Sequence, residues 1–185
     1  MQFRRHYQLE GLHAPFSASQ SHWLRYNDDK AVEYYVAKKA AELGTKLHEY
    51  AKMAIDLRIK QPKSKKTLYS YINDAIGFKM STEVVLHYSE YFFGTADSIS
   101  FKNNFLRIHD LKTGKTPVKM EQLLVYAALF CLEYSVKPGT IQMELRIYQN
   151  DDILVCTPTA EDILPIMDKI VHLTKLMEKL NREEG

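Results

Sequence analysis

Three consecutive segments in the middle of the chain constrain the fold most strongly. They cover residues 82–88, 91–102 and 105–112. Each is rich in β-branched and aromatic residues, which favour strands. Ser89-Glu90 and Asn103-Asn104 separate them, and two adjacent asparagines are typical of a tight hairpin turn. The sequence therefore predicts a three-stranded antiparallel meander.

Helical patterns and two further strands flank this meander. Apolar residues recur at helical spacing over about 29–57, 67–79, 117–134 and 160–180. Gly44-Thr45 falls inside the first of these helices, where it is expected to kink or split it. Residues 140–149 and 153–157 predict two strands joined by a turn at Asn150-Asp151. The order indicates an α/β fold with a mixed central sheet of about five strands flanked by helices, in a single domain over residues 1–185.

Charge and cysteine content exclude several classes of protein. The chain has 25 Lys and Arg against 23 Asp and Glu, a net charge of +2, which argues against a protein that binds nucleic acid by bulk charge. Its two cysteines are too few for a disulfide framework, a structural zinc site or a four-cysteine iron–sulfur cluster. No apolar run suits a membrane span, and the first residues do not resemble a signal peptide. A cytoplasmic protein without a membrane contact is expected.

Two carboxylates are expected to meet on the meander. A tight turn at Asn103-Asn104 places Asp97 opposite Asp110, with Cβ atoms roughly 5 Å apart. Lys112 lies two residues after Asp110 and so on the same face. An isolated Asp-x-Lys is usually a surface ion pair, but two carboxylates this close repel unless one is protonated or a divalent cation lies between them. Oxygen ligands favour Mg²⁺ or Mn²⁺, and such a site suits phosphodiester hydrolysis.

The same residues form motifs that resemble a known family. Gly94-Thr95-Ala96-Asp97, Asp110-Leu111-Lys112-Thr113-Gly114 and Gln122-x-x-x-Tyr126 resemble the PD-(D/E)XK nuclease superfamily, and within it the RecB-like and phage-type exonucleases. Gly44-Thr45-Lys46-Leu47-His48 resembles the upstream helical histidine of that group. The resemblance runs from about Gly44 to Tyr126 and implies a restriction-endonuclease-like core.

The resemblance also implies roles for individual residues. Asp97 and Asp110 would bind the metal, together with His48 and the backbone carbonyl of Leu111. Lys112 would position the attacking water and stabilise charge on the phosphate. The residues implied to hold the substrate are Gln122, Tyr126 and, on the first strand, Glu83. No iron–sulfur cluster is expected, although several members of the group carry one.

Two other groups of residues have alternative interpretations. The basic segment 58–66 either contacts phosphates or forms a solvated loop; its lysines are Lys60, Lys63, Lys65 and Lys66. Aromatic residues near the N-terminus either pack in a core or stack on nucleic-acid bases. These are Phe16, Trp23, Tyr26, Tyr34 and Tyr35.

The resemblance predicts a Mg²⁺- or Mn²⁺-dependent DNA nuclease, most simply an exonuclease for recombination or DNA processing in a bacterial or phage-infected cell. Its partners would be single-stranded DNA or duplex ends, and a single-strand annealing or recombination protein. Some related phage exonucleases are rings, which makes a homo-oligomer an option. The alternatives are a catalytically silent DNA-binding or recombination-partner protein of the same fold, and a structure-specific endonuclease.

Overall fold

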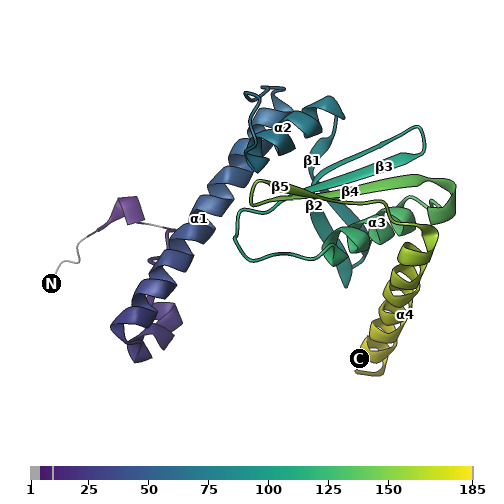
Figure 1. Cartoon of the computed structure of the whole chain (residues 1–185). Helices are drawn as coiled ribbons and strands as arrows, with labels where there is room; N and C mark the ends of the chain where they lie inside the picture. Colours follow the sequence, from purple (N-terminus) through teal and green to yellow (C-terminus); the bar gives the residue numbers. More distant parts are fainter. Residues whose placement is uncertain (1–4, 10, 185) are drawn as a thin grey trace. The chain divides into compact units, whose positions relative to one another are not determined.

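The computed structural model describes residues 5–9 and 11–184 (Figure 1). By their internal contacts the residues group into two compact units, Met1–Thr45 and Lys46–Gly185. Helix α1 (Asp28–Asp56) contains residues of both units. The first unit also holds the short 3-10 helices η1 (Tyr7–Leu9) and η2 (Ala18–Arg25). The single domain expected over residues 1–185 stays a prediction.

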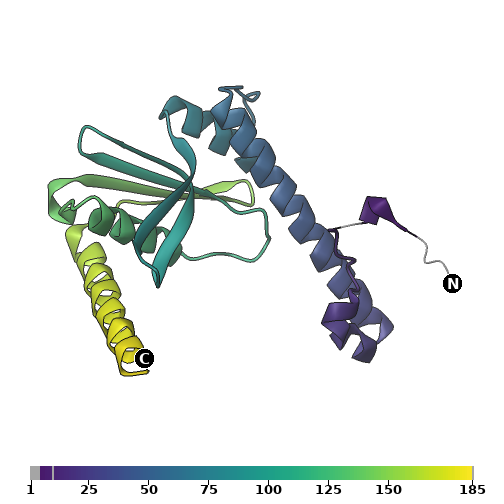
Figure 2. The ribbon, with the colours of Figure 1, turned by 180° about the vertical axis from the view of Figure 1, so that it is seen from behind.

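The second unit is built on a mixed five-stranded sheet (Figure 2). Its strands are β1 (Ser81–Ser89), β2 (Phe92–Lys102), β3 (Phe105–Leu111), β4 (Gln142–Gln149) and β5 (Asp152–Cys156). The order in the sheet follows the order in the chain. Strands β3 and β4 are parallel, and all other neighbouring pairs are antiparallel. The predicted meander and the mixed sheet of five strands are confirmed.

Two tight turns set the register of this sheet. Asn103 and Asn104 have φ of 53° and 56°, and Asn150 and Asp151 have φ of 52° and 59°. Asn and Asp tolerate this left-handed region better than other residues with a side chain, and two such residues form the turn that suits the twist of a hairpin. The first turn pairs Lys102 with Phe105 and, further along, Ser98 with His109. The predicted pairing of β2 with β3 is therefore correct.

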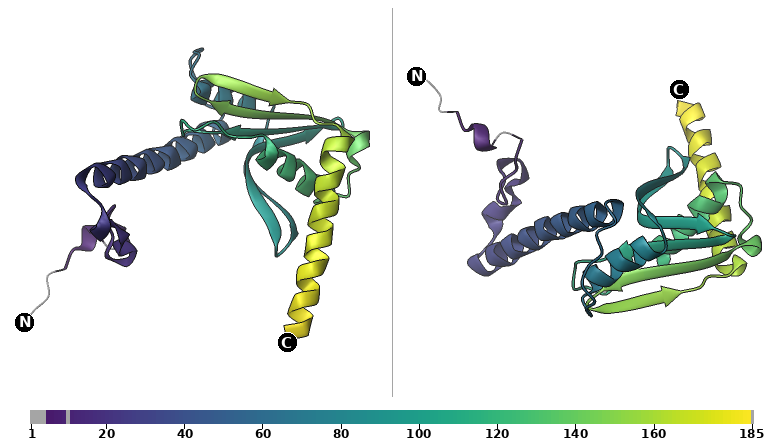
Figure 3. Two further views of the ribbon diagram at one scale, coloured as in Figure 1. Left: turned by 60° about the horizontal axis from the view of Figure 1, so that its bottom comes forward. Right: turned by 90° about the horizontal axis from the view of Figure 1, so that it is seen from above.

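Hydrophobic cores lie on the two faces of the sheet (Figure 3). The larger core contains Ile108 of β3 and side chains of α3 (Glu121–Glu133) and α4 (Ala160–Glu184). The smaller core contains Leu111 of β3 and side chains of α2 (Thr67–Gly77) and of the C-terminal end of α1. Because Ile108 and Leu111 are three residues apart on one strand, their side chains point to opposite faces. The two sides of the sheet are thus covered by different helices.

The two longest helices of the described residues are α1 and α4. Helix α1 is continuous through Gly44-Thr45, so the expected split into two helices is wrong. One glycine costs a helix only about 1 kcal/mol relative to alanine. Thr159 directly precedes α4, and its backbone N–H and hydroxyl donate to Oδ2 of Asp162 in the first turn at 2.8 and 3.0 Å. The Asp162 side chain thus satisfies the Thr159 N–H, which is one half of a capping box. No helix in the described part of the chain is long and apolar enough to cross a bilayer.

Helix α3 begins at Glu121, four residues later than the sequence indicates. Pro117 was expected to open it, because proline suits the first turn of a helix. Instead, side chains of the β4–β5 turn bind the carbonyls of the preceding loop. Gln149 Nε2 donates to the carbonyls of Gly114 and Thr116 at 2.6 and 2.8 Å. Those carbonyl groups are held by tertiary hydrogen bonds, and the loop stays outside the helix.

Candidate functional site

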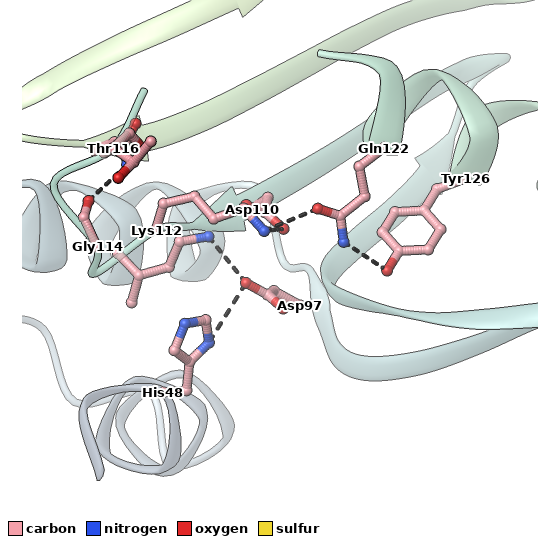
Figure 4. A network of polar contacts seen from close by, with 10 residues as sticks. His48, Asp97, Asp110, Lys112, Gly114, Thr116, Gln122 and Tyr126 are labelled. Carbon is pink, nitrogen blue, oxygen red and sulfur yellow. Dashed lines mark hydrogen bonds and ion pairs between the residues drawn. The ribbon is translucent and has the colours of Figure 1, made fainter. Parts of the chain in front are cut away.

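Strands β2 and β3 bring Asp97 and Asp110 together (Figure 4). The two residues lie one step beyond the Ser98–His109 pair, so they face each other across the strands. Asp110 is 2% exposed, and the side chain of Asp97 is 18% exposed. The backbone N–H of Leu111 donates to Oδ2 of Asp97 at 2.9 Å. Two carboxyl groups are therefore held side by side at the end of β3, largely away from water.

The surroundings disfavour two negative charges at this position. Burial, with the charge of Asp110 adding to it, raises the pKa of Asp97 to about 6. Burial also raises the pKa of Asp110, against the opposing effect of Lys112. Oδ2 of Asp110 is buried and has no hydrogen-bond partner of good geometry among the described residues. A pair of buried carboxylates in this state is stabilised by an added cation.

Lys112 supplies one positive charge to the pair. Its Nζ lies 3.1 Å from Oδ1 and 3.0 Å from Oδ2 of Asp110. The same ammonium donates to Oε1 of Gln122 at 2.8 Å, and Nε2 of Gln122 donates to the hydroxyl of Tyr126 at 3.0 Å. Gln122 and Tyr126 are four residues apart on α3 and therefore lie on one face of the helix. A continuous polar chain runs from Asp110 to Tyr126 (Figure 4).

His48 reaches the pair from α1. Its Nδ1 lies 3.5 Å from Oδ2 of Asp97, an ion-pair distance if the imidazole is protonated. Within residues 5–9 and 11–184, no three His, Cys, Asp or Glu side chains form a group placed to hold a metal ion. The donor types fit a metal nonetheless: two carboxylates and one imidazole are ligands that Mn²⁺ and Mg²⁺ accept, and the buried Oδ2 of Asp110 is paired with Lys112 Nζ without a hydrogen bond of good geometry.

Leu111 and Glu83 have different positions relative to this pair. The amide of Leu111 contacts Asp97, as described above, and the metal-binding role of its carbonyl stays a prediction. Glu83 is exposed and has φ of 51° within β1. It lies between the Thr82–Ser98 and Val84–Ala96 pairs, which places it across from Asp97 in the register. Its role in substrate binding also stays a prediction.

The four predicted basic residues occupy the segment between α1 and α2. Lys60, Lys63, Lys65 and Lys66 are all exposed. Hydrogen bonds fix both ends of this segment: the Tyr50 hydroxyl donates to Gln61 Oε1 at 2.8 Å, and the backbone N–H of Thr67 donates to Oδ1 of Asp151 at 3.2 Å. The segment is thus an anchored loop whose lysines are exposed and lie outside the hydrophobic core. Their contact with phosphates stays a prediction.

Sequence reasoning missed the role of the β4–β5 turn. Besides the two bonds of Gln149, Nδ2 of Asn150 donates to the carbonyl of Lys115 at 3.2 Å. Asp151 of the same turn caps the N-terminus of α2, as just described. This turn therefore ties the loop that follows Lys112 to the lysine-rich loop. In the sequence, Gln149 and Asn150 look only like turn residues, because their partners are backbone carbonyls about 35 residues away.

A second network lies on the opposite face of β3. The hydroxyl of Tyr148 donates to Oδ2 of Asp74 at 2.7 Å and lies 3.3 Å from Nδ1 of His109. Arg146 Nη1 donates to the same Asp74 oxygen at 3.0 Å. Burial, followed by the charges of Arg146 and Arg107, lowers the pKa of His109 to about 3. His109 is therefore neutral at neutral pH and adds no charge next to Asp110.

Taken as chemistry, the site combines two carboxylates that need a cation, an ammonium aimed at one of them, and a partly exposed imidazole. Such a set can hold a divalent cation and donate a hydrogen bond to an anionic substrate oxygen. Seven of the eight residues that the resemblance assigned to this centre are joined by these contacts, and the eighth, Glu83, lies across from Asp97 in the register. The seven are His48, Asp97, Asp110, Leu111, Lys112, Gln122 and Tyr126. Comparisons with protein-family models, with curated proteins and with solved structures find no match for this chain.

Proposed function

We propose that this chain is a metal-dependent deoxyribonuclease of the PD-(D/E)XK, RecB-like type, with a restriction-endonuclease-like core. It hydrolyses phosphodiester bonds in DNA recombination or processing, and its mode of action is that of an exonuclease. The observation that carries the proposal is the buried Asp97–Asp110 pair with Lys112 against it, held in turn by Gln122. The motif resemblance supplies the substrate.

The carboxylates and His48 would hold one or more Mg²⁺ or Mn²⁺ ions. When bound, such an ion lowers the pKa of water and neutralises charge on the phosphate. The raised pKa of both carboxyl groups supports this assignment, because burying two carboxylates side by side is costly without a cation. Binding of metal would therefore release a proton from Asp97 near pH 6.

Lys112 has a separate part in the proposed reaction. Its ammonium carries donors that can orient the attacking water or bind a non-bridging phosphate oxygen. The bond to Gln122 Oε1 keeps the ammonium at the end of β3. Gln122 and Tyr126 present an amide and a hydroxyl on the same helix face, where they can hold the strand to be cut. No covalent intermediate is required.

Cleavage assays test the proposal. We expect the purified protein with Mn²⁺ or Mg²⁺ to degrade single-stranded, duplex or nicked DNA at neutral to alkaline pH. Asp110→Asn and Lys112→Met should each lower the rate by about 100-fold or more, as is typical when a charge that stabilises the transition state is lost. Lys102→Met is the matched control, since Lys102 is exposed at the far end of β2. Intact DNA under all these conditions contradicts the proposal.

The exonuclease assignment has its own test. Closed circular and end-labelled linear DNA of the same sequence are incubated with the protein and Mn²⁺. Release of nucleotides from ends with an intact circle agrees with an exonuclease. Nicking of the closed circle shows an endonuclease instead. If neither substrate is cut, calorimetry with Mn²⁺ separates the remaining alternatives. Mn²⁺ binding that is lost in Asp97→Ala agrees with an enzyme that has another substrate. Absence of Mn²⁺ binding agrees with a silent DNA-binding protein.

A further inference from the structure

The unit Met1–Thr45 contains a cluster of aromatic side chains that do not form a buried core. Phe16 is stacked on Tyr35, with ring centroids 6.3 Å apart and an interplanar angle of 12°. It also contacts Trp23, at 6.1 Å in an edge arrangement. Tyr26 and Tyr34 contact each other at 5.6 Å. None of the five rings is buried, and Phe16 and Tyr35 are 37% and 38% exposed. Rings that served only as core would be covered.

A lysine lies over each of the three tyrosines in this cluster. Lys30 Nζ is 4.8 Å from the ring centre of Tyr26. The corresponding distances are 5.4 Å for Lys38 over Tyr34 and 5.0 Å for Lys39 over Tyr35. All three lysines are exposed. Positive charge and π faces thus alternate over one surface, which we call the aromatic–lysine surface; it consists of these three lysines and the five aromatic residues.

A cavity of about 590 Å³ opens beside Tyr35, Lys38 and Lys39. Residues with a hydroxyl or an amide group, Ser17, Ser19 and Gln20, also line it, together with Glu42. Its size lies within the range of small-ligand sites, which is roughly 300–1,000 Å³. A nucleotide offers matching chemistry: a base with a π face, polar edges for hydroxyl and amide groups, and a phosphate for the lysines.

We infer that the aromatic–lysine surface binds an unpaired nucleic-acid strand. One base stacks against the exposed Tyr35 and Phe16 rings, and the flanking phosphates lie at Lys38 and Lys39. Stacking on aromatic rings combined with cations along the backbone is how single strands are bound without sequence preference. Inside a duplex both faces of a base are covered by the neighbouring base pairs, so the interior of a duplex cannot bind in this mode. The inference rests on the proposed function for the choice of DNA, and it names the substrate class as unpaired DNA.

Trp23 makes the test direct, because it is the only tryptophan of the chain. The full chain carrying Asp110→Asn is titrated with fluorescein-labelled (dT)15 in EDTA, which prevents cleavage. Anisotropy of the label reports binding, and quenching of Trp23 by unlabelled (dT)15 reports where it occurs. We expect both signals with the single strand, and no quenching of Trp23 with a blunt hairpin duplex, whatever part of the chain that duplex contacts. Quenching of Trp23 with an unchanged circular dichroism spectrum would place the strand at this surface.

Variants separate stacking from charge. Tyr35→Ala should weaken binding by at least about fivefold, which corresponds to the loss of one base–ring stack, whereas Tyr35→Phe should leave it unchanged. Lys38→Ala with Lys39→Ala should lower the slope of log affinity against log salt concentration by about 0.7 for each phosphate that is no longer neutralised. Lys169→Ala with Lys175→Ala is the matched control, since both lysines are exposed on α4.

The outcomes that overturn the inference are specific. Binding of (dT)15 without Trp23 quenching places the strand elsewhere on the chain. An equal loss of (dT)15 affinity in the two double-lysine variants shows that only bulk charge contributes. Displacement by polyphosphate as effectively as by (dT)15 removes the role of stacking. If Tyr35→Ala fails to fold by circular dichroism, Tyr35→Phe and the lysine variants still decide. Absence of DNA cleavage by the native chain contradicts the proposed nuclease function. The binding experiments decide the inference about the aromatic–lysine surface whether or not cleavage is observed.

Discussion

A Cβ atom added to Gly94 would lie 2.8 Å from Cε1 of Tyr126. Tyr126 therefore packs directly on the backbone of β2, at a position where only glycine leaves room. This packing fixes the far end of the hydrogen-bonded chain that runs through Gln122 to Lys112. Close packing against Tyr126 thus explains why position 94 is a glycine, which the strand pattern of the sequence does not explain.

Gly94→Ala should displace Tyr126 and disturb the polar chain. We expect a loss of about 1–3 kcal/mol in unfolding free energy, which is typical of overpacking, and a lower cleavage rate if the proposed function holds. Gly77→Ala is the control, because a Cβ there meets nothing within 4 Å. Adding Tyr126→Ala should remove most of the cost of Gly94→Ala, measured as a double-mutant cycle in urea. Equal stability of Gly94→Ala and Gly77→Ala contradicts the packing role.

Asp97→Asn should stabilise the metal-free protein at high pH. The folded-state pKa of Asp97 is raised to about 6 from an ordinary value of 3.8, so folding favours its protonated form. That contribution is present below about pH 4 and is lost as pH rises through about 6. We expect native stability to fall over this window, and the Asp97→Asn variant to be more stable than the native chain by about 1–3 kcal/mol at pH 8 in EDTA. Urea unfolding at pH 4, 6 and 8 measures it.

At pH 4 the difference between Asp97→Asn and the native chain should largely vanish. Mn²⁺ should raise the melting temperature of the native chain at pH 8 and have little effect on the variant, since a ligand that binds only the folded state stabilises it. A variant less stable than the native chain at pH 8 would show that the carboxylate is stabilised in place by Leu111 N–H and Lys112.

Gln149→Ala should release the loop of residues 112–120. Gln149 Nε2 holds two carbonyls of that loop, and each net hydrogen bond is worth about 1 kcal/mol. We expect a loss of about 1–2 kcal/mol and faster amide hydrogen exchange confined to the loop. Gln142→Ala is the matched control, because Gln142 is exposed at the start of β4. Unchanged exchange rates in the loop would show that Gln149 does not hold it.

Replacement of Lys63, Lys65 and Lys66 by alanine should weaken duplex DNA binding through charge alone. If all three bind phosphates, the slope of log affinity against log salt concentration falls by about 0.9 for each phosphate that is no longer neutralised. The control replaces the exposed Lys169, Lys175 and Lys179 of α4. Both triple variants are made in the Asp110→Asn protein, and their DNA affinity is measured by filter binding between about 50 and 200 mM salt. The slopes distinguish the loop variant from the control variant. Identical slopes for both triple variants show a solvated loop.

The predicted strand pairing succeeded because its determinants are local. Asn103-Asn104 tolerate left-handed backbone, and a two-residue turn leaves one register for the strands that it joins. Opposition of Asp97 and Asp110 follows from that register. The start of α3 could not be predicted in the same way, because Pro117 is suited to open a helix and the competing hydrogen bonds come from Gln149, distant in the chain.

Local patterns in the chain were enough to predict the five strands, the turns between them and which residues of β2 and β3 share a face, because side-chain alternation and turn chemistry act over a few residues. The depth at which Asp97 and Asp110 are buried follows only from tertiary packing, and burial is the main cause that raises their pKa. The same packing places Tyr126 on Gly94, ties Gln149 to the loop after Lys112 and leaves the N-terminal rings uncovered. These properties depend on neighbours brought from distant parts of the chain, and a local pattern carries no information about them.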